Sequence, residues 1–312
     1  MHHTRLVLVL LCAVPSWVVV PAYSQQTLPS ESKRDARVAQ AVLRHAEIAR
    51  PSEGETRERI MVDLASGTIE CRIDDDATET RVIAEFMVDG RDAADAERRA
   101  KLAKLFTERA GDGTIVVDAV IPGTVLPADS VKVTIVAPPT DELVLKSASG
   151  TVRAKSGTGT LRTATKSGAI VIEGHRGPID ARAVSGRIDI TGASESVQVT
   201  SVSGAVALAL GDANDQPFNV ESRSGAVRVE VGAEFDGVVT LTSSSGVLAL
   251  LDTAKRARIP QATSTRKVVE IGAAAGQSKI STTSGAVTLV LRAKIVGSAP
   301  SGVGQASRGA NQ

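Results

Sequence analysis

The sequence is poor in the residues that build most binding and catalytic centres. Phe, Trp and Tyr together make up 2% of the 312 residues, and there are only four histidines and two cysteines. The formal net charge is +1, which gives no overall attraction to nucleic acid or to anionic lipid. We therefore expect no nucleic-acid partner, no metal site and no cofactor.

Residues 1–24 have the pattern of a secretory signal. Arg5 precedes an uncharged run over residues 6–20, and Ala22 and Ser24 offer a small-x-small cleavage site. The run is short for a membrane span, so we expect no stable transmembrane span after cleavage, with an uncleaved anchor as the alternative. The sequence thus predicts export to the periplasm, the cell surface or the medium.

What the sequence has in abundance is a Ser-Gly pair followed by alternating apolar residues. From glycine to glycine the steps are 18, 18, 18, 21, 21 and 39 residues. A repeat of about twenty residues is typical of a solenoid. The pairs are Ser149-Gly150, Ser167-Gly168, Ser185-Gly186, Ser203-Gly204, Ser224-Gly225, Ser245-Gly246 and Ser284-Gly285.

Each repeat holds two short strands, one before and one after its Ser-Gly pair. After Gly168, for example, Ile170 and Ile172 are apolar, and a second apolar pair starts seven residues before the glycine, at Leu161. The longer repeats add all of their extra residues at the turn that lacks the Ser-Gly pair. A coil of stacked parallel strands explains this better than an antiparallel meander does. We predict a mainly β protein with a parallel β-helix of 18–21 residues per coil, right-handed by default, and an antiparallel β-sandwich as the alternative.

The last step of 39 residues equals 21 plus 18, so a degenerate coil is expected at Lys267, with Val269 and Ile271 in the apolar columns. Each corner glycine is expected at positive φ, where other residues are strained. The corner serines are expected to satisfy turn backbone groups through a row of hydroxyls.

Composition divides the rest of the chain. Residues 25–55 are expected to be a helical or flexible spacer, with a helix at 30–50 ending before Pro51. Residues 56–140 are expected to form an N-terminal α/β cap, with a helix at 92–110 whose apolar stripe is Leu102, Leu105 and Phe106. Residues 141–292 form the solenoid, and the Gly/Ser/Ala-rich residues 293–312 are expected to be a disordered tail.

The variable turns are the best candidates for binding, because inserted loops on one edge of a solenoid often form its binding face. We call this surface the loop edge; a row of solvated loops without a function is the alternative. His175 is expected to be a solvated loop residue. The loop edge comprises His175, Arg176, Asp212, Asp215, Glu234, Asp236, Lys255, Arg256 and Arg258.

No convergent catalytic set is evident. The histidines are too scattered for a metal site or a Ser-His-Asp triad, and we assign no catalytic residue. Asp74-Asp75-Asp76 suggests a solvated turn rather than a calcium loop, and Cys71, in an apolar column, a buried inert thiol. An outward cluster of Asp180 with Asp189 and Arg182 with Arg187 is the only arrangement that suggests a polysaccharide-acting enzyme.

The Ser-Gly series, with Ser66-Gly67 and the strand at 133–139 before it, resembles the bacterial "putative adhesin" family of β-strand-repeat domains of unknown function. The resemblance implies an exported β-solenoid with an adhesive role, whose partner is an envelope or surface protein or a glycan. We therefore predict a non-catalytic envelope or surface interaction module. The alternatives are an envelope scaffold or sensor and a polysaccharide-acting enzyme.

Overall fold

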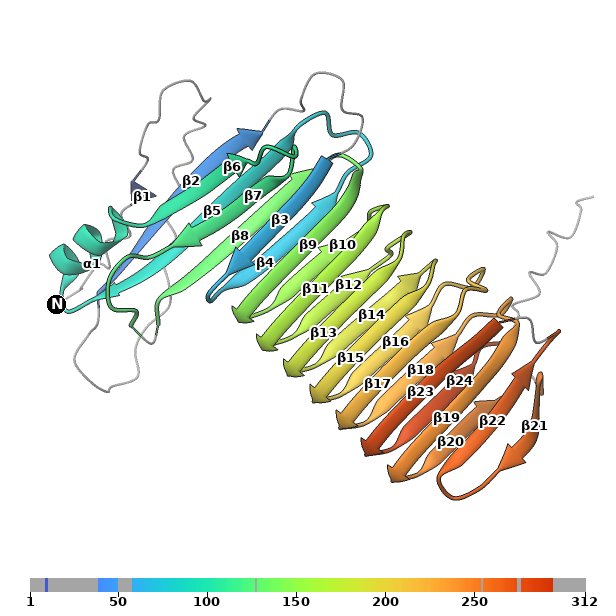
Figure 1. Ribbon diagram of the computed structural model, residues 1–312. Helices are drawn as coiled ribbons and strands as arrows, with labels where there is room; N and C mark the ends of the chain where they lie inside the picture. Colours follow the sequence, from blue (N-terminus) through green and yellow to red (C-terminus); the bar gives the residue numbers. More distant parts are fainter. Residues whose placement is uncertain are drawn as a thin grey trace, which may run out of the picture.

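The described part of the protein is a rod of two stacked β-sheets, and 12 strands of each sheet lie within the described residues (Figure 1). The computed structural model describes residues 9–10, 39–49, 58–126, 128–253, 255–273 and 276–293. Each coil of the rod gives one strand to each sheet: the strand before a Ser-Gly corner belongs to sheet B, and the strand after it belongs to sheet A. The central coils, in sequence order, are β9 (Thr140–Ser149) with β10 (Val152–Lys155), β11 (Thr160–Ser167) with β12 (Ile170–Glu173), β13 (Ile179–Ser185) with β14 (Ile188–Ala193), β15 (Val197–Ser203) with β16 (Val206–Leu210), and β17 (Phe218–Ser224) with β18 (Val227–Val231).

Equivalent strands of these coils pair in parallel and in register. In sheet A, Val152 lies beside Ile170, Ile170 beside Ile188, and Ile188 beside Val206. The parallel β-helix is thereby confirmed, and the antiparallel sandwich is wrong for this part of the chain. In these coils the residues two and four positions after each corner glycine form columns that face inward, and their side chains are at most 3% exposed. Burial of each Val, Ile or Leu contributes about 1.5–3 kcal/mol to the stability of the fold.

Cys71 lies in one of these columns, beside Ala154 of the next coil. Its thiol is free and buried, as expected. Burial raises the pKa of Cys71 to about 12. The thiol therefore stays protonated and unreactive at neutral pH.

The Ser-Gly corners are held by main-chain hydrogen bonds between coils. Gly150 N–H donates to the Ser167 carbonyl at 2.9 Å, and Gly168 N–H to the Ser185 carbonyl at 3.0 Å. The corner serine side chains are exposed, and within the described residues the expected bonds from their hydroxyls to the turn backbone are not found. The buried hydroxyls belong to residues three positions before the glycine, such as Ser147, whose Oγ donates to the Ser149 carbonyl at 3.1 Å.

At the C-terminal end, the order of coils in space differs from their order in sequence. The strands are β19 (Gly237–Ser245), β20 (Leu248–Asp252), β21 (Ala257–Ala262), β22 (Arg266–Ile271), β23 (Gly276–Ser284) and β24 (Val287–Leu291). The last coil, β23 with β24, lies between the coil of β17 and β18 and the coil of β19 and β20. β22 pairs antiparallel with β19 and β21, so the expected coil at Lys267 is wrong.

The N-terminal end is interleaved in the same way. The strands β3 (Glu58–Leu64) and β4 (Thr68–Ile73) form a coil between β9 with β10 on one side and β7 (Ile115–Val120) with β8 (Ser130–Ala137) on the other. All of these pairs are parallel. The expected boundary at residue 140 is therefore not a boundary in packing, because two coils of the stack lie before it.

The remaining N-terminal elements cover the end of the rod. They are β1 (Val9–Leu10), β2 (Ala39–Ala49), β5 (Thr80–Gly90), α1 (Ala93–Ala100) and β6 (Lys104–Arg109). β5 pairs antiparallel with β8, β2 with β5, and β6 with β7. The helix α1 packs on β5 and β2 and buries Ala96 and Ala100 (Figure 1).

Both expected helices need correction. Within the range 30–50, the described residues 39–49 form the strand β2, in which Ala41 and Leu43 alternate inward. The expected helix at 92–110 ends after Ala100, and the chain continues as the strand β6. Leu105 faces inward from β6, while Leu102 and Phe106 are about half exposed. Pairing along a sheet edge outweighs helix propensity here. The expected signal (1–24) and tail (293–312) lie outside the described residues apart from Val9–Leu10 and Ala293.

Candidate binding edge

The loops that follow the strands of sheet A lie one above another along one edge of the rod (Figure 1). Hydrogen bonds join successive loops: Ser194 N–H donates to the His175 carbonyl at 3.1 Å, Gly211 N–H to the Ala193 carbonyl at 2.8 Å, and Glu234 N–H to the Asp212 carbonyl at 3.0 Å. These bonds bring His175, Asp212 and Glu234 of the predicted loop edge to one side of the molecule.

The prediction that His175 is a solvated loop residue is wrong, because its side chain is only 1% exposed. Its Nε2 lies 2.9 Å from the Gly159 carbonyl oxygen and its Nδ1 lies 3.4 Å from the Ser156 carbonyl oxygen. The buried ring packs against the turn of the preceding coil that contains Ser156 and Gly159. Sequence reasoning missed this because a polar loop residue is ordinarily exposed.

A decrease in pH is expected to destabilise the protein through His175. Burial lowers the pKa of His175, while its hydrogen bonds to the carbonyls of Gly159 and Ser156 act in the opposite direction. A lowered folded-state pKa means that stability is fully present above the unfolded value of about 6.5 and is lost as the pH falls toward the folded value. Between pH 7.5 and 5.5 the melting temperature of the wild type should fall more than that of His175→Gln. Equal decreases in both proteins would contradict this.

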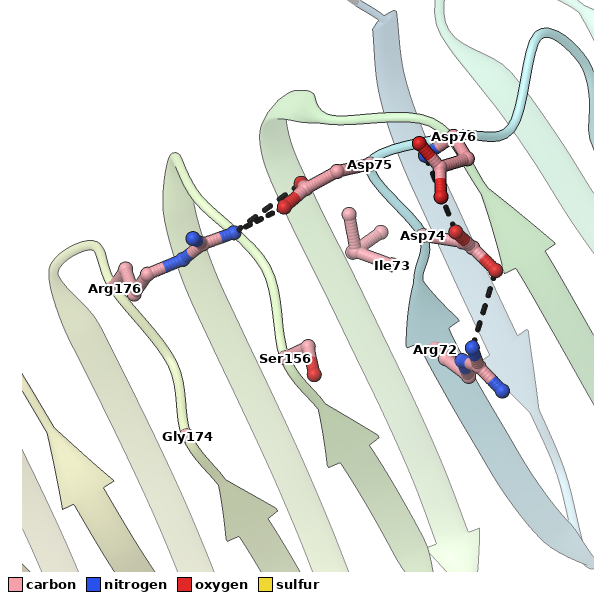
Figure 2. A pocket seen from close by; sticks show the side chains of 8 residues that line it. All are labelled: Arg72, Ile73, Asp74, Asp75, Asp76, Ser156, Gly174 and Arg176. Carbon is pink, nitrogen blue, oxygen red and sulfur yellow. Dashed lines mark hydrogen bonds and ion pairs between the residues drawn. The ribbon is translucent and has the colours of Figure 1, made fainter.

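Arg176 lies next to His175 and faces an acidic turn of the first coil. Its guanidinium donates to Asp75 Oδ2 at 2.8 Å and to Oδ1 at 3.2 Å, while Arg72 donates to Asp74 at 3.2 Å (Figure 2). These side chains surround a hollow of about 450 Å³. It is lined by Arg72, Ile73, Asp74, Asp75, Asp76, Ser156, Gly174 and Arg176. The hollow is shallow, and two of its carboxylates are already bound to arginines.

The acidic residues of the loop edge lie on the loops after β16 and β18. Asp212 is 3.4 Å from Arg292, and the Asp215 carboxylate accepts from the Gln216 amide at 2.7 Å. Glu234 and Asp236 are also exposed. These four residues make the middle of the loop edge negatively charged.

Side chains that donate to loop carbonyls hold these loops in place. Asn214 donates to the Ala193 and Glu195 carbonyls at 2.8 and 3.0 Å. Arg256 donates to the carbonyls of Gly232 and Ala233, and Arg292 donates to that of Leu210. Arg256 therefore fixes loop backbone and is only partly available to a partner.

Lys255 and Arg258 differ from Arg256, because both are exposed near the hairpin of β21 and β22. Lys255 lies in the turn before β21 with φ of 53°. Arg258 lies opposite Glu270 in the antiparallel register of the hairpin. The structure thus places these two cations at the C-terminal end of the rod.

The outward cluster that suggested an enzyme does not form. Asp180 lies on β13 in sheet B and Asp189 lies on β14 in sheet A, so the two carboxylates point to opposite faces of the rod. Each is paired with its own arginine, Asp180 with Arg182 at 2.7 Å and Asp189 with Arg187 at 2.5 Å. Within the described ranges, no group of three His, Cys, Asp or Glu residues is placed to hold a metal ion. No helix in that part of the chain is long and apolar enough to cross a membrane.

Two buried ionic networks near the N-terminal end were not predicted. Asp129 accepts from Arg99 at 2.6 Å and from the N–H groups of Asp89 and Leu126 at 2.8 and 2.7 Å. Burial acts to raise the pKa of Asp129, but these hydrogen bonds lower it below its usual value. In the second network, buried Glu58 accepts from Arg109 at 2.6 Å. The Arg99–Asp129 and Arg109–Glu58 pairs join residues 30 and 51 positions apart, which no local sequence pattern reveals.

The chain belongs to the Toastrack DUF4097 family, whose match covers residues 53–256. No curated protein matches the sequence. Among solved structures, a "putative cell adhesion protein" of Clostridium sporogenes is 11% identical, with 80% of this chain and 99% of that chain covered and a TM-score of 0.33. A "putative adhesin" of Bacteroides fragilis is 12% identical, with 80% and 97% covered and a TM-score of 0.41. A "putative lipid binding protein" of Parabacteroides distasonis is 8% identical, with 80% and 96% covered and a TM-score of 0.25.

Proposed function

We propose that this protein is an exported, non-catalytic interaction module of the bacterial envelope or surface, which binds a protein or glycan through its loop edge. The observation that carries the proposal is the fixed row of loops on one side of the rod. Hydrogen bonds between loops and side-chain contacts such as Asn214 to the Ala193 carbonyl hold that row in one conformation. Loops positioned by a rigid scaffold are the typical sites of recognition.

The chemistry of the edge indicates what it binds. Asp212, Asp215, Glu234 and Asp236 form an exposed negative section. A partner with cationic groups, or a glycan rich in hydroxyl donors, complements such a row of carboxylates. Because the loops are already ordered, little conformational entropy is lost on binding, and this favours affinity.

Neutralising the negative section is expected to weaken binding. The triple variant Asp212→Asn, Asp215→Asn and Asp236→Asn should lose roughly tenfold or more in affinity for partners captured on an array of envelope proteins and glycans. The matched control is Glu142→Gln, Glu173→Gln and Asp180→Asn, which removes as many carboxylates from the flat faces of the rod and should bind as the wild type does.

Two results would contradict the proposal. One is an equal loss in both triple variants, which would show that only overall charge matters. The other is cleavage of a cell-wall or extracellular polysaccharide by the purified protein, lost on Asp180→Asn or Asp189→Asn. Fractionation of cells provides a separate test of export.

A further inference from the structure

The two ends of the rod are closed differently. At the N-terminal end, α1 packs on β5 and β2, and the outermost strand of sheet B, β6, carries Lys104, Glu108 and Arg109. At the C-terminal end, β20 is the last strand of sheet A and β21 the last of sheet B. No helix covers the C-terminal end among the described residues.

Among the described residues, no strand pairs with the outer main-chain edge of β20, which we call the open edge. In each coil that precedes β20 in the stack, the residue two positions after the corner glycine donates its N–H to the coil beside it. Val152 donates to the Ala169 carbonyl and Val287 to the Val247 carbonyl, both at 2.9 Å. Leu248 holds that position in β20, where sheet A ends. The N–H and carbonyl groups of Leu250 point to the same edge as those of Leu248, because the main-chain groups of alternate residues in a strand face one edge. Lys267 Nζ donates to the Leu248 carbonyl at 2.9 Å, which satisfies one group of this edge.

The side chains of β20 are unusually apolar for an exposed edge strand. Leu248 and Leu250 are half-buried, whereas Val287 and Leu289 in the neighbouring strand are 0% exposed. Leu251 is 48% exposed. Natural edge strands are usually protected by charge, proline or a bulge.

The edge of β21 shows that protection, because it contains Pro260 and a register shift between Arg258 and Gln261. In β20 the one charged residue is Asp252, at its end. The open edge of β20 is therefore the better template for a further strand.

Positively charged side chains lie on the hairpin of β21 and β22, which reaches this edge where Lys267 contacts the Leu248 carbonyl. On the flat faces of the rod, cations such as Arg182, Arg187 and Arg228 lie within 2.5–2.7 Å of a carboxylate. At the C-terminal end, Lys255, Arg258 and Arg266 are exposed, and no ion pair joins any of them to a carboxylate within the described residues, although Glu270 lies opposite Arg258 in the hairpin. An apolar strand edge with exposed cations on the adjoining hairpin complements an apolar segment flanked by acidic residues.

We propose that the open edge of β20 binds an extended apolar segment of a partner protein, flanked by acidic residues, as an additional strand of sheet A. Main-chain hydrogen bonds to Leu248 and Leu250 provide the affinity, and Leu251 and the cations of the adjoining hairpin select the sequence. This surface shares only Lys255 and Arg258 with the loop edge. The carboxylate variants of the loop edge leave it intact, so the two proposals fail or succeed separately.

The test uses the full chain and a fluorescent synthetic peptide. The probe carries the sequence of residues 287–291, which already pairs with β20 on its other side, with two glutamates at each end. Two control peptides have lysines in place of the glutamates or proline in place of the central leucine. Fluorescence anisotropy should show at least tenfold tighter binding of the acidic probe than of either control.

Protein variants locate the contact. Arg258→Glu should weaken binding of the probe about tenfold, whereas Arg223→Glu, at an exposed cation on the central strand β17, should not. Leu250→Pro should abolish binding, because it removes an edge N–H. In the unaltered protein, hydrogen exchange at the Leu250 amide should slow on addition of the probe, while the Leu208 amide in β16 should not change, which keeps the test valid if Leu250→Pro fails to fold.

Several outcomes would overturn the proposal. They are equal binding of the acidic and lysine peptides, or an unchanged rate of exchange at Leu250. Dimerisation of the wild type that Leu250→Pro abolishes would identify a second copy as the occupant instead. Binding to phosphatidylglycerol vesicles that Arg258→Glu abolishes, without binding of the probe, would identify a membrane surface.

Discussion

A chain that stops at Gly272 is expected to lose its fold or to melt at least about 10 °C below the full chain. The truncation removes β23 and β24, which lie inside the stack rather than at its end. Ile280, Val287, Leu289 and Leu291, all at most 1% exposed, leave with them. At about 1.5–3 kcal/mol each, their burial is comparable with the whole stability of a typical domain, about 5–15 kcal/mol.

The truncation also separates β19 and β20 from the rest of the rod. These strands contact β23 and β24, not β17 and β18. Circular dichroism during heating and limited proteolysis should show the loss. A chain that stops at Ala293 keeps every coil and should melt within about 2 °C of the full chain. Similar melting of the two truncated chains would show that the last coil does not lie within the stack.

The second large effect is expected from Gly186→Ala at a Ser-Gly corner. Gly186 has φ of +138°, and a Cβ at this position would lie 1.8 Å from the Gly168 carbonyl oxygen of the preceding coil. That oxygen belongs to backbone hydrogen-bonded in the stack and cannot move alone. We expect a loss of more than about 4 kcal/mol, which is exceptional for a single substitution.

Gly174→Ala is the matched control, because it is the same substitution at another glycine of positive φ. Gly174 has φ of +64°, and no atom lies within 4 Å of its would-be Cβ. Only backbone strain of about 1–2 kcal/mol is therefore expected. Asp215→Ala, in an exposed loop, should change stability by less than about 0.5 kcal/mol. Denaturant unfolding would measure all three, and equal losses for both glycine variants would refute the close-contact argument.

The repeat in the sequence was sufficient to predict the central rod. Positions such as Ile170, Ile188 and Val206 are equivalent in sequence and are neighbours in space, because an 18-residue period places each coil directly on the previous one. The buried thiol of Cys71 followed from the same columns. A strict period determines register, and register determines which side chains are inside.

The ends of the rod could not be predicted in this way. Lys267 follows the arithmetic of the repeat, yet its strand turns back in a hairpin, since which strand lies beside it depends on long-range pairing. The strand at Ala39–Ala49 has a composition that also suits a helix, and pairing with β5 decides between the two. The position of His175 had a local signal only in its flanking glycines, Gly174 and Gly177.

The interleaved ends restrict how this architecture can change in length. Duplication of an 18-residue unit in the middle, for example between β12 and β13, would extend the molecule by one strand spacing of about 4.8 Å and preserve every neighbouring register. A copy added after β24 would have no vacant place, since β20 already occupies the adjoining layer. Lengthening by tandem duplication is thus confined to the centre, while both termini keep a fixed construction.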